Sequence, residues 1–362
     1  MIRTGQEVLI MAGGTGGHIF PGLAVADSLR ERGVEVRWLG ARGGMECQRV
    51  PSHGIALEVV DISALRGKGA GRWLLLPWRL MRAVWQAFRH LGAYRPACAI
   101  SFGGYAAGPG GLAARLRGVP LLVHEQNRIP GLTNRVLARI ASRVLQAFPG
   151  TWADGLRPLT CGNPVRKEVA ALEAPENRLA GRAGPVRLLV TGGSQGARSL
   201  NRLVPAALAL KPSGLQVDVR HQCGRGWQEE TAAAYQGQGI VADVSEFIED
   251  MATAYGWADV VVCRAGALTV SEVAAAGLAA LFIPFPHAVD DHQTRNADYL
   301  AERGGAVVLT EPGLDAQTLG AALNGLLADR PKQIRMAVRS RAAAIPRSAD
   351  HVAELCAEYV DR

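Results

Sequence analysis

The sequence predicts an α/β fold with two domains, each built on a parallel β-sheet that helices cover on both faces. Three observations support this prediction. The chain has 362 residues, more than one hydrophobic core usually serves. Short, almost continuously apolar segments alternate with helical ones, as strands buried between two helical layers do. A pattern of strand, glycine loop and helix also occurs twice, near the N-terminus and again about halfway along the chain.

The first half begins with an apolar segment, residues 8–12, which ends at Gly13-Gly14-Thr15-Gly16-Gly17-His18. Helical spacing follows over residues 19–30. Further strands are predicted at residues 34–39, 97–101, 120–124 and 144–147. We expect this first domain to cover residues 1–163 and to end at Gly162-Asn163-Pro164.

The second half repeats the pattern, with a strand at 186–190, a glycine loop at 191–197 and a helix at 200–210. Further strands are predicted at residues 217–221, 260–263, 280–283 and 306–309. The second domain is expected to cover residues 164–340. A final helix, about residues 341–362, has its apolar side chains on one face, so we expect it to pack back on the first domain.

Composition indicates which kinds of partner the protein binds and in which cellular compartment it is found. The net charge of +8 and the isoelectric point near 9.5 favour anionic partners. No nucleic-acid-binding motif appears, so we expect no nucleic-acid partner. The six cysteines are isolated in the sequence, which is typical of reduced thiols in the cytoplasm. No apolar run approaches the ~20 residues of a membrane span, and the N-terminus lacks the apolar region of a signal peptide.

The glycine loops indicate anion binding, because backbone N–H groups at the start of a helix attract phosphate. The first loop lacks the third glycine of the dinucleotide fingerprint, and the second strand ends without a carboxylate, which argues against an NAD-binding oxidoreductase. Neither loop contains the lysine motif of P-loop NTPases. A ligand held between two domains, each with its own loop, is the interpretation that remains.

Five other segments place polar side chains beside glycine or proline after predicted strands, where open α/β sheets bind ligands. Those segments are residues 101–105, 124–134, 247–251, 264–272 and 284–296. Together with the two glycine loops and Gly162-Asn163-Pro164-Val165-Arg166, they resemble the MurG family of bacterial glycosyltransferases over nearly the whole chain. The resemblance implies a GT-B fold, in which two Rossmann-like domains flank the active site, and an enzyme of peptidoglycan synthesis, cell-wall biogenesis, cell shape and division.

The resemblance also implies the donor, UDP-N-acetylglucosamine (UDP-GlcNAc), and its site. Uracil would lie against the Ile248 backbone with Arg166 nearby, and Glu272 would accept the ribose hydroxyls. The diphosphate would meet Ser194 and the start of the helix that contains Ala267, Leu268, Thr269, Val270 and Ser271. Gln293 and Asn296 would hold the GlcNAc hydroxyls. His292 departs from some relatives, which carry a Gln pair there.

On the acceptor side, the resemblance implies lipid I, whose MurNAc C4 hydroxyl would receive GlcNAc with inversion to give lipid II. The residues that would shape this side are Thr15, Gly16, Gly17, His18, Tyr105, Glu125, Asn127 and Asn134. His18 is our first candidate for the catalytic base and Glu125 the second, since imidazole titrates near working pH. The non-catalytic alternative is that His18 only hydrogen-bonds substrate or caps its helix. No Asp-x-Asp pair is present, so we expect neither a metal nor another cofactor.

An amphipathic segment in the first half indicates a membrane-binding surface. Trp73, Trp78, Arg79, Arg82, Trp85 and Phe88 combine aromatic and cationic side chains, which suit the headgroup region of an anionic membrane. A helix buried in the protein would explain the apolar arc equally well. With the family resemblance, we expect peripheral binding at the cytoplasmic face of the bacterial inner membrane.

Two other functions remain open on the sequence alone. A UDP-GlcNAc 2-epimerase shares the fold type and the donor but needs no lipid acceptor, and the Trp/Arg segment argues against it. A non-catalytic nucleotide-sugar sensor at the membrane is the second, and the density of polar groups on both halves argues against it.

Overall fold

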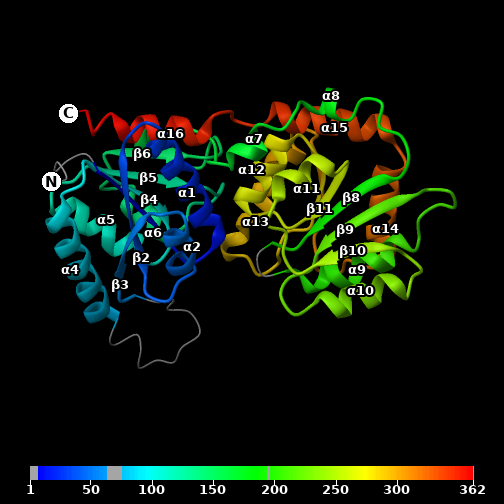
Figure 1. The fold of residues 1–362 in the computed structure, drawn as a ribbon, viewed down its shortest axis with the longest axis horizontal. Coiled ribbons are helices and arrows are strands. Elements are labelled where there is room, and N and C mark those ends of the chain that lie inside the picture. Colours follow the sequence, from blue (N-terminus) through cyan, green and yellow to red (C-terminus); the bar gives the residue numbers. More distant parts are fainter. Residues whose placement is uncertain (1–6, 63–75, 194–195, 362) are drawn as a thin grey trace. The chain divides into compact units, whose positions relative to one another are not determined.

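The structure is a computed structural model that describes residues 7–62, 76–193 and 196–361 (Figure 1). The chain forms two compact units. The first comprises Met1–Arg166 together with Arg347–Arg362, and the second comprises Lys167–Pro346. The chain therefore passes from the first unit to the second after Arg166, three residues beyond the expected boundary, and returns after Pro346.

Among the described residues, the first unit contains a parallel sheet of seven strands in the order β3-β2-β1-β4-β5-β6-β7. Its strands are β1 (Glu7–Ala12), β2 (Glu35–Ala41), β3 (Ala56–Val60), β4 (Cys98–Gly103), β5 (Leu121–Glu125), β6 (Arg143–Gln146) and β7 (Leu159–Thr160). Its helices are α1 (Gly16–Glu31), α2 (Glu46–Ser52), α4 (Leu76–Tyr94), α5 (Ala107–Leu116), α6 (Leu132–Leu137), the 3-10 helix η1 (Asp154–Leu156) and α16 (Ser348–Ala357).

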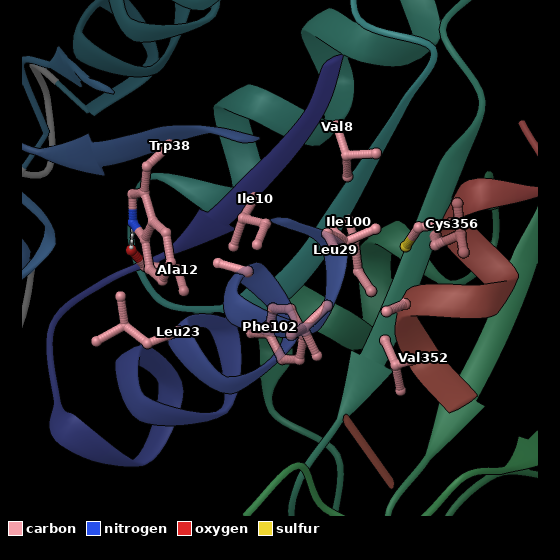
Figure 2. Packing of buried hydrophobic residues seen from close by; sticks show 14 of the residues in the cluster. Val8, Ile10, Ala12, Leu23, Leu29, Trp38, Ile100, Phe102, Val352 and Cys356 are labelled. Carbon is pink, nitrogen blue, oxygen red and sulfur yellow. Dashed lines mark hydrogen bonds between the residues drawn. The ribbon is translucent and has the colours of Figure 1, made fainter. Parts of the chain in front are cut away.

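Strand β1 lies in the middle of this sheet and is buried on both faces. Val8, Ile10 and Ala12 point into one hydrophobic cluster, and Leu9 and Met11 point into another on the opposite face. This alternation follows from the two-residue period of a strand, and it explains why the segment is apolar throughout. On the first of these faces, the Trp38 indole donates a hydrogen bond of 2.9 Å to the Ala12 carbonyl oxygen (Figure 2).

Helix α16 packs against α1 and completes the same cluster. Val352 and Cys356 are fully buried beside Leu29 of α1 and Ile100 of β4 (Figure 2). The helix is shorter than the expected 341–362, because Arg347 precedes it in a left-handed conformation. The residues just before Arg347 belong to the second unit, whose last helix is α15 (Arg330–Ala342).

The described part of the second unit contains a parallel sheet of six strands in the order β10-β9-β8-β11-β12-β13. The strands are β8 (Val186–Thr191), β9 (Val217–Gln222), β10 (Ala242–Ser245), β11 (Val260–Cys263), β12 (Ala279–Phe282) and β13 (Ala306–Val308). The helices are α7 (Lys167–Ala170), α8 (Pro175–Arg178), α9 (Arg198–Leu208), α10 (Gln228–Gln236), α11 (Met251–Trp257), α12 (Ala267–Ala276), η2 (Val289–Asp291), α13 (His292–Ala301), α14 (Ala316–Leu327) and α15.

In both sheets, the order in which the chain adds strands reverses at the first strand. In the first unit the chain builds β1, β2 and β3 outward and then places β4 on the other side of β1. In the second unit β8 likewise lies between β9 and β11. Open α/β sheets bind ligands at the carboxyl ends of the strands on either side of such a switch. This topology brings the sequence-predicted segments of each unit to one edge of its sheet.

Candidate active site

The first glycine loop joins β1 to α1. Gly14 adopts a left-handed conformation, with φ of 91°, and Thr15 is the extended residue that precedes the helix. His18 lies in the first turn of α1, where its Nδ1 is 3.2 Å from the Gly13 carbonyl oxygen and 3.5 Å from the Thr15 hydroxyl. With its hydrogen on Nδ1, the ring donates to that carbonyl and carries its lone pair on Nε2.

The loop after β4 packs directly against the first glycine loop. A methyl group on Gly104 would lie 2.3 Å from the Gly13 carbonyl oxygen, so only glycine fits there. A methyl group on Gly103 would lie 3.4 Å from His18 Nε2, and one on Gly14 would lie 3.5 Å from the Tyr105 ring. The structure thus brings His18 and Tyr105, two of the predicted acceptor residues, to adjoining loops.

Glu125 ends β5 and is buried, and both of its oxygens accept hydrogen bonds. Oε1 accepts from the Asn127 backbone at 3.0 Å and from the Asn127 amide at 3.1 Å. Oε2 accepts from the Gly131 backbone at 3.1 Å and from the Asn134 amide at 2.9 Å. Four N–H donors thus occupy both oxygens of the carboxylate. This geometry suits a residue that orients the two asparagines better than one that takes a proton.

The hydrogen bonds around Glu125 continue through neighbouring side chains to Ser101 of β4 and to the Gly162 carbonyl oxygen. Ser101 donates to Asn134 Oδ1 at 3.0 Å, which ties β4 to α6. His124, next to Glu125, is fully buried; its Nε2 lies 2.9 Å from the Gly162 carbonyl oxygen and its Nδ1 lies 3.2 Å from the Gln126 amide. Burial lowers the pKa of His124 to about 4, so this imidazole is neutral at pH 7.

In the second unit, the loop between β8 and α9 carries Gly193 and Gly196 in left-handed conformations. A methyl group on Gly196 would lie 2.3 Å from the Cys223 carbonyl oxygen, so this loop also needs glycine. The Gln222 amide donates to the Gly193 carbonyl oxygen at 3.0 Å. Ser194, the predicted diphosphate contact, lies outside the described residues.

Helix α12 starts directly after β11, with Gly266 as the extended residue before it. Its first turn contains Ala267, Leu268 and Thr269, so its N–H groups and the positive end of its dipole lie at the carboxyl edge of the sheet. Val270 is buried, and Ser271 donates to the Ala267 carbonyl oxygen at 2.9 Å. Glu272 is buried and accepts a long hydrogen bond of 3.4 Å from the Tyr255 hydroxyl.

Gln293 and Asn296 lie on α13 and both contact the segment between β11 and α12. Gln293 Oε1 accepts from the backbone of Ala265 at 3.3 Å and of Phe285 at 3.0 Å, and the Asn296 amide donates to the Ala265 carbonyl oxygen at 3.2 Å. Arg264 supports the same segment, with hydrogen bonds to the Ile283 carbonyl oxygen and the Glu311 carboxylate. The predicted sugar contacts therefore lie beside the start of α12.

Two predicted uracil contacts are separated by the boundary between the units. Ile248 is half-buried and precedes α11 in the second unit. Arg166 ends the first of the two segments that form the first unit, and its guanidinium carbon lies 5.8 Å from the centre of the Phe20 ring. That Arg166 contacts uracil stays a prediction.

Helix α4 presents two different faces. Ala83, Ala87 and Leu91 are buried, whereas Trp78 and Trp85 are 63% and 57% exposed with Met81 between them. Arg89 lies 5.0 Å from the Trp85 ring, and Arg82 is paired with Asp61 at 3.0 Å. Phe88 is half-buried under the Arg117 guanidinium, 3.6 Å from the ring centre, and Arg79 is partly exposed. Trp73 lies outside the described residues.

The apolar arc of α4 is therefore divided: Val84 and Phe88 are partly buried against the core, whereas Trp78, Met81 and Trp85 are exposed. Small alanines form the buried face, which lets α4 approach α5 closely, and the tryptophans remain in contact with solvent. In the described residues, no helix is long and apolar enough to cross a membrane. The same residues contain no group of three or more His, Cys, Asp or Glu side chains arranged to hold a metal ion.

One buried carboxylate beside the first glycine loop was absent from the predicted site. Glu46, the first residue of α2, accepts a hydrogen bond of 3.2 Å from the Gly14 backbone. The only sequence signal for it is an acidic residue two positions after Gly43-Gly44, in the segment that follows the strand predicted at residues 34–39.

Comparisons with known proteins agree with this arrangement. Residues 8–146 match the N-terminal domain of glycosyltransferase family 28, and residues 187–352 match its C-terminal domain. A UDP-N-acetylglucosamine–N-acetylmuramyl-(pentapeptide) pyrophosphoryl-undecaprenol N-acetylglucosamine transferase from Xanthomonas campestris pv. campestris (strain B100) is 57% identical over 97% of this chain and 81% of its own. The chain belongs to the MurG family.

Other members of the MurG family also match nearly the whole chain. The transferase of the same name from Marinobacter nauticus is 51% identical over 98% of this chain and 97% of its own. The crystal structure of Acinetobacter baumannii MurG superposes with a TM-score of 0.84, at 38% identity over 98% of this chain and 99% of that one. The calicheamicin glycosyltransferase CalG4, 15% identical with a TM-score of 0.66, shares the fold alone. The expected GT-B fold with two Rossmann-like domains is confirmed.

Proposed function

We propose that the protein transfers GlcNAc from UDP-GlcNAc to the C4 hydroxyl of MurNAc in lipid I, forming lipid II for peptidoglycan synthesis. The observation that carries this proposal is the identity of 51–57% over nearly the full chain with transferases whose names state this donor and this acceptor. A UDP-GlcNAc 2-epimerase and a non-catalytic sensor are less well supported, because neither needs an acceptor site of the kind that surrounds His18.

The acceptor side belongs to the first unit. Thr15, His18 and Tyr105 lie on adjoining loops, and Glu125 fixes the amides of Asn127 and Asn134 nearby. Gly16 and Gly17 are the first two residues of α1; Gly16 is buried, whereas Gly17 is exposed. In this assignment His18 takes the proton from the C4 hydroxyl on Nε2, while Nδ1 donates to the Gly13 carbonyl oxygen.

The donor-side residues, apart from Arg166, belong to the second unit. Ile248 and Arg166 are assigned to uracil, Glu272 to the ribose hydroxyls, and Gln293 and Asn296 to GlcNAc. Ser194 and the first turn of α12, which includes Ala267, Leu268, Thr269, Val270 and Ser271, are assigned to the diphosphate. As the bond between C1 of GlcNAc and the phosphate oxygen breaks, negative charge grows on the diphosphate. The dipole of α12 stabilises that charge.

The exposed face of α4 is assigned to an anionic membrane surface. Trp78, Met81 and Trp85 would enter the headgroup region, and Arg79, Arg82 and Arg89 would meet lipid phosphates. A lipid-linked acceptor lies in the membrane, so a transferase that binds it from the cytoplasmic face of the inner membrane needs such a surface on the acceptor unit.

Turnover of radiolabelled UDP-GlcNAc with a lipid I analogue, with and without EDTA, tests the function directly. Transfer of label to the lipid at the same rate in both conditions is the expected result. Binding or epimerisation of the UDP-sugar without any transfer would contradict the proposal and favour the epimerase or the sensor. Loss of transfer in EDTA would contradict only the metal-independent part.

A further inference from the structure

Glu46 places a buried negative charge against the first glycine loop. Its side chain is fully buried. Oε2 accepts from the Gly14 backbone at 3.2 Å, and Oε1 accepts from the Ala41 backbone, at the end of β2, at 2.8 Å. Glycine loops of this kind ordinarily offer their N–H groups to phosphate. Here a carboxylate from the same chain already lies on the loop.

Three glycines make room for this carboxylate. A methyl group added to Gly13 would lie 2.2 Å from Oε1 of Glu46. One added to Gly44 would lie 2.3 Å from Oε2, and one added to Gly40 would lie 2.6 Å from Cγ. The three come from the loop after β1, the turn before α2 and strand β2. Any larger residue at these positions would displace Glu46, so the surroundings are shaped around a single side chain.

A buried carboxylate is costly to fold, because it loses its hydration. Hydrogen bonds from backbone N–H groups offset part of that cost, and they also fix the donors. One of these donors is Gly14, whose left-handed conformation precedes Thr15 and His18. Gly13, on which a methyl group would meet the same carboxylate, supplies the carbonyl oxygen that orients the His18 ring.

We propose that Glu46 is the resident anion of the first glycine loop. It accepts from the Gly14 N–H group, a donor that such a loop would otherwise offer to phosphate, and it holds Gly13 and Gly14 so that His18 is correctly oriented. The donor's diphosphate is thereby excluded from the first loop and left to the second.

The orienting role rests on the proposed function of His18, whereas the occupancy of the loop by an anion does not. Glu46 is thus a positioning residue, and its removal should affect the rate of transfer and leave donor binding alone. In Glu46→Ala we expect kcat with a lipid I analogue to fall at least tenfold, and the KM for UDP-GlcNAc to stay within twofold of the wild type.

Formate provides a test that a purely structural role would not pass. Sodium formate at 10–100 mM, on the order of concentrations that fill weak sites, should restore much of the kcat of Glu46→Ala and raise its Tm. Sodium chloride at equal ionic strength should do neither. Formate should leave the wild type unchanged. It should not rescue Glu46→Gln, in which the amide fills the space but supplies only one acceptor oxygen.

Two further variants cover the case in which Glu46→Ala does not fold. Gly44→Ala displaces the carboxylate without removing its charge, and it should lower kcat as Glu46→Gln does. Glu7→Gln is the matched control, because Glu7 is a buried carboxylate at the other end of β1 that pairs with Arg37 at 2.9 Å. We expect its kinetic constants to stay within twofold of the wild type.

The outcomes separate the two proposals. If the wild type does not transfer GlcNAc, the proposed function fails, and the formate effect on the Tm of Glu46→Ala still tests the resident anion. If the wild type is active, Glu46→Gln and Gly44→Ala with kcat within twofold of it would overturn the orienting role. A Glu46→Ala variant that folds but gains neither Tm nor kcat from formate would overturn the anion site.

Discussion

The Asn134 amide donates to Glu125 Oε2 at 2.9 Å, and the same amide donates to the His124 carbonyl oxygen at 3.1 Å. Asn134, in α6, thus binds both the backbone and a side chain at the end of β5. Replacement of Glu125 by Gln turns one acceptor oxygen into a donor that faces other donors. We expect a loss of about 2 kcal/mol in the free energy of unfolding, measured in urea, together with a lower kcat.

The same variant separates the two candidates for the base. A Glu125→Gln protein that keeps the stability of the wild type but loses nearly all turnover would identify Glu125 as the base and contradict our assignment. A parallel loss of stability and partial loss of turnover supports its orienting role.

Replacement of His18 by Gln removes the proposed base without emptying its site. We expect kcat to fall on the order of 100- to 10,000-fold, which is the usual contribution of general base catalysis. The KM for UDP-GlcNAc should change little, because the donor is assigned to the other unit. Steady-state kinetics with both substrates varied measure this split.

His53 supplies the control for that experiment. It follows α2 in the same unit and is exposed. His53→Gln should behave as the wild type. If His18→Gln retains more than a tenth of the wild-type kcat, the imidazole only binds substrate or caps its helix.

The proposed contact between Glu272 and the ribose predicts selectivity between UDP and 2′-deoxy-UDP. A carboxylate that accepts from a hydroxyl contributes about 1.5–3 kcal/mol, so the wild type should prefer UDP by about 10- to 100-fold. Glu272→Ala should bind both nucleotides weakly and about equally. Calorimetric titration of the four combinations measures the coupling, and a variant that still prefers UDP tenfold would disprove the contact.

Acid should destabilise both units through buried histidines. Burial lowers the pKa of His124 to about 4 and that of His221, in the second unit, to about 3. Both values lie below the ordinary value near 6.5, so the unfolded chain binds protons first as the pH falls. The stability that neutral histidine contributes is complete above pH 6.5 and is lost as the pH falls toward 4 and 3.

Between pH 7 and pH 5 each histidine should remove about 2 kcal/mol of unfolding free energy. His221→Gln keeps groups able to bond with the Tyr235 hydroxyl, which lies 2.8 Å from His221 Nδ1, and with Asn201, 3.1 Å from Nε2. Its stability should therefore fall less between these two pH values, as measured by urea unfolding. An unchanged pH dependence would show that His221 is not neutral in the folded state.

The exposed tryptophans of α4 should control binding to membranes. We expect Trp78→Ser and Trp85→Ser each to reduce sedimentation with phosphatidylglycerol vesicles about tenfold, since each removes a large apolar side chain from the proposed contact. Turnover of a water-soluble acceptor analogue should be unchanged. Val241→Ser, which alters a fully exposed apolar residue of the second unit, is the control. Equal sedimentation of all variants would place the membrane surface elsewhere.

Central strands were predictable because they are buried on both faces. The apolar segment at residues 260–263 coincides with β11, and residues 186–190 lie within β8. Strands β3 and β10 were missed, because they lie at edges of their sheets and mix polar with apolar residues, as in Ala242-Asp243-Val244-Ser245. An edge strand depends on its neighbour for its conformation, and local composition does not reveal that neighbour.

The site shows the same division. Glycine loops can be recognised in the sequence from their composition, and the family resemblance implies roles for the residues on them. Glu46 could not be found in this way, because its contact with Gly14 joins residues 32 positions apart. The face that α4 buries depended on α5, whose close approach requires Ala83 and Ala87 rather than the larger side chains.

The return of the chain to the first unit sets the order in which the protein can fold during synthesis. Val352 and Cys356 complete the cluster around Leu29 and Ile100, yet they follow the whole of the second unit in the chain. Every segment of the second unit emerges before them. We therefore expect the second unit to be finished first, while the earlier-made half of the chain keeps an incomplete apolar surface until α16 has emerged from the ribosome.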